Sequence, residues 1–361
     1  MAQARKPVAL LLLALAAGLI AGVADARTVV RPGPAGAVRL VTEEAMIASP
    51  QAGLKIYVRN KHPAGMARFS PDRTLVFVHG ATYPASAAFD LELGGVSWMD
   101  YIARRGFDVY LLDLPGYGRS TRPAAMDQPA EANPPIETTA EAVADYAAVA
   151  DWVLARRRLA KLDVAGWSWG TTIAAGFAAE NPAKVNRLVL YAPVWLAQPG
   201  DPATPVSAPA TLGAYRLVSR DGALKRWLNG VPQDKQAEVL PPAWFDQWQK
   251  ATWATDPKSA SANPPVLRAP NGVFLDFQRF WGAGKPTYDP AKITAPTLMI
   301  QAEWDRDTPP ARSQGLFPLL TNAAWKQYVL IGEGSHHVMM EKNRMLLFQA
   351  VQTFLEEDGP R

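Results

Sequence analysis

Cysteine is absent from the 361 residues of this sequence. The absence excludes catalytic thiols, disulfide frameworks, zinc fingers and iron–sulfur clusters. Histidine is scarce as well, and the whole chain has four of these residues, His62, His79, His336 and His337. Any reaction that uses an imidazole as its base must therefore depend on one of these four positions.

The chain also lacks a large excess of charge of one sign. Lysine and arginine number 37 against 33 aspartate and glutamate residues, a formal net charge of +4, and the most basic run is 156–158. Nucleic-acid-binding domains gather their basic residues in a patch or along one helix, so we expect no nucleic acid partner. Hydrophobic residues make up 48% of the chain and charged residues 19%, which excludes a disordered protein and indicates a sizeable core.

Long apolar runs are missing except at the N-terminus. Arg5 and Lys6 precede the apolar stretch Val8–Val23, and Ala24–Ala26 has the small-x-small pattern that a signal peptidase recognises. The stretch has 16 residues, fewer than the about 20 that a membrane-spanning helix needs. We therefore predict a signal peptide over residues 1–26 and export to the periplasm or the medium. After cleavage, no stable membrane insertion is expected.

Beyond residue 70, short apolar runs rich in β-branched residues alternate with helical patterns. The predicted strands are 74–78, 108–112, 162–165, 187–191, 297–301 and 327–331, and the predicted helices are 97–105, 138–157, 169–179 and 344–355. Continuous apolar strands that alternate with helices predict an α/β fold with a doubly wound, mostly parallel sheet covered on both faces. The alternating segments 38–46 and 54–59 predict an antiparallel hairpin at one edge.

The interval 196–290 interrupts this alternation. It is rich in proline at both ends and contains five of the twelve tryptophans, Trp227, Trp244, Trp248, Trp253 and Trp281. The pattern predicts several short helices, which we interpret as an inserted helical cap, or lid; extra packing on the side of the sheet is the alternative. The core of the fold would then consist of residues 27–195 and 291–361.

The segment Gly166–Gly170 has the pattern G-x-S-x-G between a predicted strand and a predicted helix. In that context the pattern is typical of a nucleophile elbow, a sharp turn that presents the serine hydroxyl at the edge of the sheet. Bulky side chains two residues before or after the serine would collide with the neighbouring strand and helix, and glycine at both places removes the collision. Ser168 is therefore the predicted nucleophile.

A serine nucleophile needs a base, and the base needs a carboxylate that orients it. In this type of fold the chain order is serine, acid, histidine, each at the end of a strand. We predict Asp305 as the acid and His336 as the base, with Asp307 or Glu303 and His337 as the alternatives. The adjacent histidines lack the spacing of a zinc pair, so no metal and no cofactor are expected.

The segment after the first predicted parallel strand supplies the rest of the expected site. The backbone N–H groups of Ala81 and Trp169 are predicted to form the oxyanion hole, which stabilises the developing negative charge by a few kcal/mol. His79 is interpreted as a buried structural residue that binds nearby backbone. Thr82 and Trp167 are predicted to line the substrate pocket.

Together these segments resemble the α/β-hydrolase superfamily over nearly all of the mature chain. The resemblance rests on the sequences HGATYP at 79–84, DLPGYGRS at 113–120, GWSWG at 166–170, QAEWDRDTPP at 301–310 and GEGSHHVMME at 332–341. It implies the same roles for Ser168, Asp305, His336, Ala81 and Trp169. Glu341, five residues after His336, is similar to an acid found in many members. Members that open epoxides or cleave carbon–halogen bonds carry aspartate at the nucleophile position, and Ser168 argues against both activities.

The substrate class follows from the aromatic residues around the predicted nucleophile. Trp167 and Trp169 flank Ser168, and the insertion rich in tryptophan is expected to close above it. We therefore expect a small-molecule substrate, a small to medium, mostly neutral and hydrophobic carboxylic ester. The sequence GWSWGTT is also similar to the elbow of proline iminopeptidases, which makes an aminopeptidase the alternative, although HGATYP departs from their usual HGGPG. A binding protein without activity would need an incomplete triad.

Overall fold

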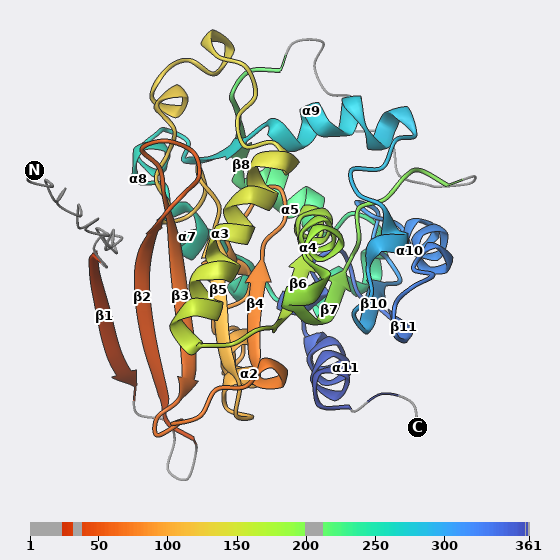
Figure 1. The fold of residues 1–361 in the computed structure, drawn as a ribbon. Coiled ribbons are helices and arrows are strands. Elements are labelled where there is room, and N and C mark those ends of the chain that lie inside the picture. Colours follow the sequence, from red (N-terminus) through yellow and green to blue (C-terminus); the bar gives the residue numbers. More distant parts are fainter. Residues whose placement is uncertain (1–23, 32–37, 199–211, 358, 360–361) are drawn as a thin grey trace, which may run out of the picture.

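The structure is a computed structural model that describes residues 24–31, 38–198, 212–357 and 359 (Figure 1). Its centre is a sheet of nine strands, and their order across the sheet is β1 (Ala24–Arg31), β2 (Leu40–Ala48), β3 (Lys55–Pro63), β5 (Asp108–Asp113), β4 (Thr74–Val78), β6 (Leu162–Trp167), β7 (Val185–Tyr191), β10 (Thr297–Ala302) and β11 (Lys326–Ile331). From β5 to β11 all neighbouring strands are parallel. The strands β1, β2 and β3 join antiparallel at one edge. The predicted mostly parallel sheet and its antiparallel edge pair are confirmed.

Alternate residues of each central strand point to opposite faces of the sheet. In β4, Leu75 and Phe77 belong to one core cluster, whereas Val76 and Val78 belong to the other. Both faces are covered, so every position of the strand is buried. This explains why the central strands are continuous apolar runs in the sequence rather than alternating ones.

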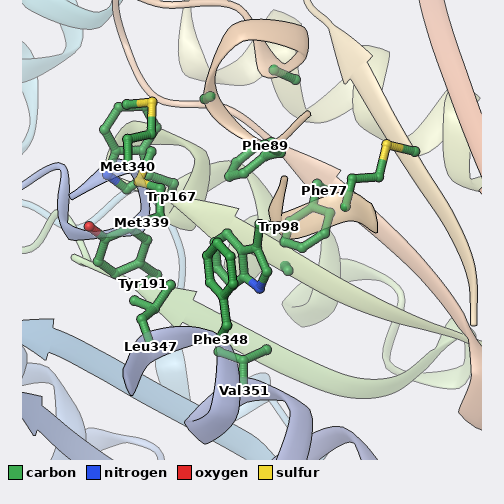
Figure 2. Packing of buried hydrophobic residues seen from close by; sticks show 14 of the residues in the cluster. Phe77, Phe89, Trp98, Trp167, Tyr191, Met339, Met340, Leu347, Phe348 and Val351 are labelled. Atoms are coloured by element: carbon green, nitrogen blue, oxygen red, sulfur yellow. The ribbon is translucent and has the colours of Figure 1, made fainter. Parts of the chain in front are cut away.

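Helices from distant parts of the chain cover the two faces. The first face packs against α1 (Ala85–Ala88), α2 (Trp98–Ala103) and α11 (Arg344–Glu356). There Trp98 of α2 stacks on Phe348 of α11, with ring centroids 5.4 Å apart (Figure 2). The second face packs against α3 (Thr139–Arg157), α4 (Trp169–Glu180) and α10 (Pro310–Leu316). These contacts hold the N- and C-terminal thirds of the chain on one sheet.

The segment between β7 and β10 adds helices and a second small sheet. Its elements are β8 (Tyr215–Ser219), α5 (Arg220–Trp227), α6 (Gln236–Val239), α7 (Pro242–Trp253), α8 (Pro257–Ala260), β9 (Val266–Pro270) and α9 (Gly272–Arg279). The strands β8 and β9 pair antiparallel. The sequence predicted helices alone in this segment, and that prediction was wrong for these two strands. Each strand has five residues and four helices separate the pair, so no hairpin turn marks it in the sequence.

The N-terminal prediction falls mostly on residues that the structure does not describe. Residues 1–23 of the predicted signal peptide lie outside the described residues, and its last three residues form the beginning of β1. Among the helices of the described ranges, none has the length and apolar character that crossing a bilayer requires.

Candidate active site

Ser168 lies in the turn between β6 and α4, in a backbone conformation that side chains rarely adopt. Its φ is 56° and its ψ is −125°, a strained combination that tight packing must maintain. A Cβ atom on Gly166 would lie 2.2 Å from the carbonyl oxygen of Gly170, and one on Gly170 would lie 2.5 Å from the carbonyl oxygen of Val78. Only glycine fits both positions, so β4, β6 and α4 can approach closely enough to impose the turn.

His336 joins Ser168 to Asp305. Its Nε2 lies 2.9 Å from the Ser168 Oγ, and its Nδ1 lies 2.8 Å from the Asp305 Oδ2. A carboxylate oxygen accepts hydrogen bonds, so the Nδ1 carries the proton and the Nε2 of the neutral ring accepts from the serine hydroxyl. The loops after β6, β10 and β11 thus bring together three residues that are far apart in the chain.

The Asp305 carboxylate is fixed by several donors besides His336. Its Oδ1 accepts from the backbone N–H groups of Asp307 and Thr308, at 2.9 and 2.8 Å. Its Oδ2 accepts from the Gln301 amide at 2.8 Å and from the Thr308 hydroxyl at 2.9 Å. The carboxylate is buried, and these bonds orient it toward the His336 Nδ1.

The alternative acids lie elsewhere. The Asp307 Oδ2 is 3.9 Å from the other ring nitrogen of His336, the Nε2, and it accepts from the Nε of Arg226 at 2.6 Å. Burial opposes ionisation of Asp307, but the positive charge of Arg226 outweighs it and lowers the pKa of this carboxyl to about 2. Glu303 is exposed and accepts from the backbone N–H of Glu333.

The alternative base, His337, faces away from this hydrogen-bonded series. Burial holds the pKa of its imidazole well below the usual range, so the ring is neutral. Its ring stacks on Trp227 of α5, with centroids 4.8 Å apart. Neither ring nitrogen of His337 has a hydrogen-bond partner among the described residues.

Two aromatic side chains hold the loop that carries His336. The indole N–H of Trp167 donates to the His336 carbonyl oxygen at 3.1 Å, and the Tyr191 hydroxyl donates to the same oxygen at 2.8 Å. The Trp167 and Tyr191 rings stack, with centroids 6.4 Å apart, in the core of the first face (Figure 2). Trp167, which was predicted to line the pocket, is 2% exposed and supports the position of His336.

His79 orients the backbone at the predicted oxyanion hole. Its Nδ1 donates to the carbonyl oxygen of Gly80 at 2.7 Å, and its Nε2 accepts from the Leu114 N–H at 3.1 Å. Burial lowers the pKa of His79, which favours this neutral form. The Gly80 carbonyl and the Ala81 N–H belong to one planar peptide and point in opposite directions, so His79 fixes the direction of the Ala81 N–H. A Cβ on Gly80 would lie 2.9 Å from the Ser168 Cβ, which shows how close this loop passes.

Trp169, the second predicted oxyanion donor, is the first residue of α4. An N–H group in the first turn of a helix has no acceptor within the helix, so this donor is available beside Ser168. The Trp169 side chain points away into the core of the second face, where its Nε1 donates to the Thr139 hydroxyl at 2.9 Å.

Two arginines lie beside the site that were not predicted from the sequence. Arg226 of α5 donates from its Nη1 to the Thr82 hydroxyl at 2.7 Å, and Arg216 of β8 donates to the same oxygen at 2.8 Å. Arg216 also donates to the Ala81 carbonyl oxygen at 2.7 Å. Both arginines lie more than a hundred residues from these partners, in a segment without a regular pattern, so no local signal identified them.

An aromatic cluster joins His337 to the segment between β7 and β10. It consists of Tyr83, Trp227, Trp248 and His337, and its ring centroids are 4.7 Å apart for Tyr83 and Trp248 and 4.8 Å apart for Trp227 and Trp248. Within the described residues, the Tyr83 hydroxyl and the Trp248 Nε1 make no hydrogen bond. Tryptophans of this segment therefore reach the loop of the candidate base, as the sequence suggested.

Glu341 supports the same loop from inside the protein. Its side chain accepts from the Ser335 hydroxyl and N–H and from the Trp227 Nε1. Burial raises the pKa of this carboxyl to about 7 despite those donors. In the part of the chain that the structure describes, no group of three or more histidine, aspartate or glutamate side chains is arranged to hold a metal ion.

Comparisons with known proteins agree with this fold. Residues 73–343 match a family model described as the alpha/beta hydrolase fold. The enol-lactonase from Burkholderia xenovorans LB400 is 16% identical, with a TM-score of 0.58 over 86% of this chain and 100% of that chain. A thermophilic esterase from Thermogutta terrifontis is 15% identical, with a TM-score of 0.57 over 86% and 97% of the two chains. A bacterial membrane phospholipase A is 21% identical, with a TM-score of 0.56 over 87% and 86%. At these identities the likeness concerns the fold alone.

Proposed function

The chain belongs to the alpha/beta hydrolase fold family, and from this premise we propose that it is a carboxylic ester hydrolase with Ser168 as its nucleophile. The observation that carries the proposal is the hydrogen-bonded series from the Ser168 Oγ through His336 to Asp305, with contacts of 2.9 and 2.8 Å. A serine hydroxyl is a weak nucleophile on its own, and a neutral imidazole held in this tautomer is the base that activates it.

In each half of the reaction, His336 takes up one proton and gives one up. The Ser168 Oγ attacks the ester carbonyl carbon while its proton passes to the His336 Nε2. The N–H groups of Ala81 and Trp169 donate to the oxyanion of the tetrahedral intermediate. When the intermediate collapses, the bond to the alkoxy oxygen breaks and His336 protonates the departing alcohol. Water then attacks the acyl-enzyme with His336 as its base, which releases the acid and restores the Ser168 hydroxyl.

We propose small to medium esters with hydrophobic groups as substrates, reached beneath the segment 196–290, which acts as a cap. The aromatic cluster supports the cap in this proposal, because the buried Trp227 and Trp248 pack this segment against Tyr83 and the loop of the base. We also propose that the chain is exported after cleavage at Ala26. An aminopeptidase would need a free carboxylate for the substrate ammonium group, and the Asp307 carboxylate that faces His336 is already paired with Arg226.

Covalent labelling tests the nucleophile directly. A fluorophosphonate probe is expected to label the purified protein, and Ser168→Ala is expected to abolish labelling and to reduce 4-nitrophenyl butyrate hydrolysis by several orders of magnitude, because triad members act as one unit. Ser261→Ala, an exposed serine far from the triad in sequence, is the control and should label normally.

Two results would contradict the proposal. Labelling that persists in the Ser168→Ala protein would show a different nucleophile. A higher kcat/KM for prolyl-4-nitroanilide than for 4-nitrophenyl butyrate would favour the aminopeptidase.

A further inference from the structure

The guanidinium of Arg226 lies between the two functional parts of the proposed site. Its Nε donates to the Asp307 Oδ2 at 2.6 Å, and that oxygen is 3.9 Å from the His336 Nε2. Its Nη1 donates to the hydroxyl of Thr82 at 2.7 Å, and Thr82 follows the predicted oxyanion donor Ala81 directly. The partner Asp307 is thus beside the nitrogen that would protonate the leaving group, and the partner Thr82 is beside the predicted oxyanion hole.

Arg216 and Arg226 differ in their hydrogen-bond partners. Arg216 lies against the same Thr82 hydroxyl, and its other acceptors are neutral: the carbonyl oxygens of Ala81, Ala269 and Pro270 and the side chain of Asn271. In the described ranges no carboxylate forms an ion pair with Arg216. Asp307 pairs with Arg226, and the Asp305 carboxylate is directed at the His336 Nδ1. Arg216 is thus partly buried without a carboxylate in contact, and an anionic ligand nearby would stabilise it.

Arg226 also keeps hydrogen-bond donors free. A guanidinium has five N–H groups, and the two bonds of Arg226 use its Nε and its Nη1. Its Nη2 makes no hydrogen bond to any described residue, and the side chain is 33% exposed. Both N–H groups of Nη2 and one of Nη1 can therefore donate hydrogen bonds to a carboxylate.

From this geometry we propose that Arg226 binds a carboxylate of the substrate, so that the preferred ester carries an acidic group in addition to its hydrophobic part. The inference rests on the proposed ester hydrolase function and narrows its substrates to hydrophobic esters that also carry a carboxylate, in place of the mostly neutral esters expected from the sequence. Arg216 holds the Thr82 hydroxyl and adds a positive charge that has no carboxylate in contact, while Arg226 binds the substrate carboxylate. The carboxylate belongs either to the acyl group or to the leaving group.

Two matched ester pairs test the proposal and distinguish these two positions. In the acyl pair, mono-4-nitrophenyl glutarate is compared with its methyl ester. In the leaving-group pair, 4-carboxyphenyl butyrate is compared with its methyl ester, and in both pairs release of the phenol is measured. We expect the wild-type protein to favour the charged member of one pair at least tenfold in kcat/KM, mainly through a lower KM.

The variant Arg226→Met removes the positive charge and the guanidinium N–H groups. We expect the ratio of kcat/KM between the charged and neutral members to fall at least tenfold in this variant, and Arg226→Lys to give an intermediate ratio. Lys225→Met, on the same helix, removes an equal charge from an exposed neighbour, and should keep the wild-type ratio. Fluorophosphonate labelling shows that each variant is folded with an active Ser168.

The possible failures are distinct. If the wild-type protein hydrolyses the neutral esters but favours neither charged member, or if the preference persists in Arg226→Met and Arg226→Lys, the carboxylate site is wrong and the ester hydrolase proposal stands. If none of the four esters is hydrolysed, the proposed function is wrong and this inference falls with it.

Discussion

Two aspartates that are two residues apart face opposite nitrogens of one imidazole. Asp305 lies against the Nδ1 of His336, where a carboxylate selects the tautomer that can accept the serine proton. Asp307 lies 3.9 Å from the Nε2, on the side of the substrate, and is paired with Arg226. The loop after β10 therefore places one carboxylate where it can orient His336 and the other where it pairs with Arg226.

The two aspartates should respond very differently to the same substitution. Asp305→Asn is expected to lower kcat on the order of 10⁴-fold, because the amide cannot hold the protonated Nδ1 and leaves His336 in the wrong tautomer. Asp307→Asn should cost far less, because His336 keeps its orienting carboxylate. Both effects are measured as kcat on 4-nitrophenyl butyrate with active sites counted by fluorophosphonate titration. The reverse order would place the acid of the triad at position 307.

At the scale of elements, α3 begins with a capping box that the sequence already indicated. The Thr138 hydroxyl accepts from the Glu141 N–H at 3.4 Å, and the Glu141 carboxylate accepts from the Thr138 N–H at 2.7 Å. Each side chain thus accepts a hydrogen bond from the backbone N–H of the other residue, and these N–H groups have no acceptor within the helix. The following residue, Thr139, accepts from the Trp169 indole at 2.9 Å, so the start of α3 also fixes the elbow helix α4.

Removal of this cap should weaken the whole fold measurably. Thr138→Ala is expected to lower the free energy of unfolding by about 1 kcal/mol, the usual value of an N-cap threonine. Urea denaturation followed by circular dichroism measures the change. Thr353→Ala, an exposed threonine within α11, is the control, and it should leave stability unchanged or raise it slightly because alanine has the higher helix propensity. Equal losses in the two variants would contradict a specific capping role.

Elements with a local signal could be predicted from the sequence, and those held by distant partners could not. The central strands are continuous apolar runs because helices cover both faces, and α3 and α4 begin at recognisable residues, Thr138 and Ser168. The strands β8 and β9 gave no such signal, since α5 to α8 lie between them. Their pairing depends on side chains such as Arg268, which forms a buried ion pair with Asp256 at 2.6 Å.

At the scale of the whole molecule, some residues of the candidate site could be predicted from the sequence and others could not. The residues that the structure brings together around His336 could be named in advance, because a parallel sheet places all its carboxyl strand ends on one edge. Arg216 and Arg226 could not, because their contacts with Thr82 span 134 and 144 residues. The residues of the proposed triad are thus readable in the sequence, whereas the two arginines, which we propose act on the substrate, depend on how the segment between β7 and β10 folds back.

The stability of the whole molecule should depend on pH through a buried carboxyl outside the candidate site, at the opposite end of β6 from Ser168. Asp163, at the start of β6, accepts from the Asn186 amide at 2.8 Å, and its other oxygen has no partner among the described residues. Burial raises the pKa of this carboxyl to about 7. The folded state therefore binds a proton that the unfolded chain releases near pH 4, and the associated stability is lost as the pH rises through about 7.

The variant Asp163→Asn should remove this loss. Relative to the wild type, its free energy of unfolding is expected to rise by more than about 1 kcal/mol between pH 4 and pH 8, since one pKa unit corresponds to about 1.4 kcal/mol. Urea denaturation across this pH range measures the difference. Asp151→Asn, which changes an aspartate that is 55% exposed, is the control. A difference that does not change with pH would contradict the raised pKa.

The order of strands across the sheet has a consequence for how activity arises during synthesis. The strand β10 pairs with β7, and the entire intervening segment separates these two strands in the chain. Contacts between residues so distant in the chain form slowly and leave partly folded states exposed in the meantime. A nascent chain that has completed β6 and α4 therefore already presents Ser168 but has no base for it. With the proposed triad, activity requires the final sixth of the chain to dock, so we expect a truncated or stalled product to be inert.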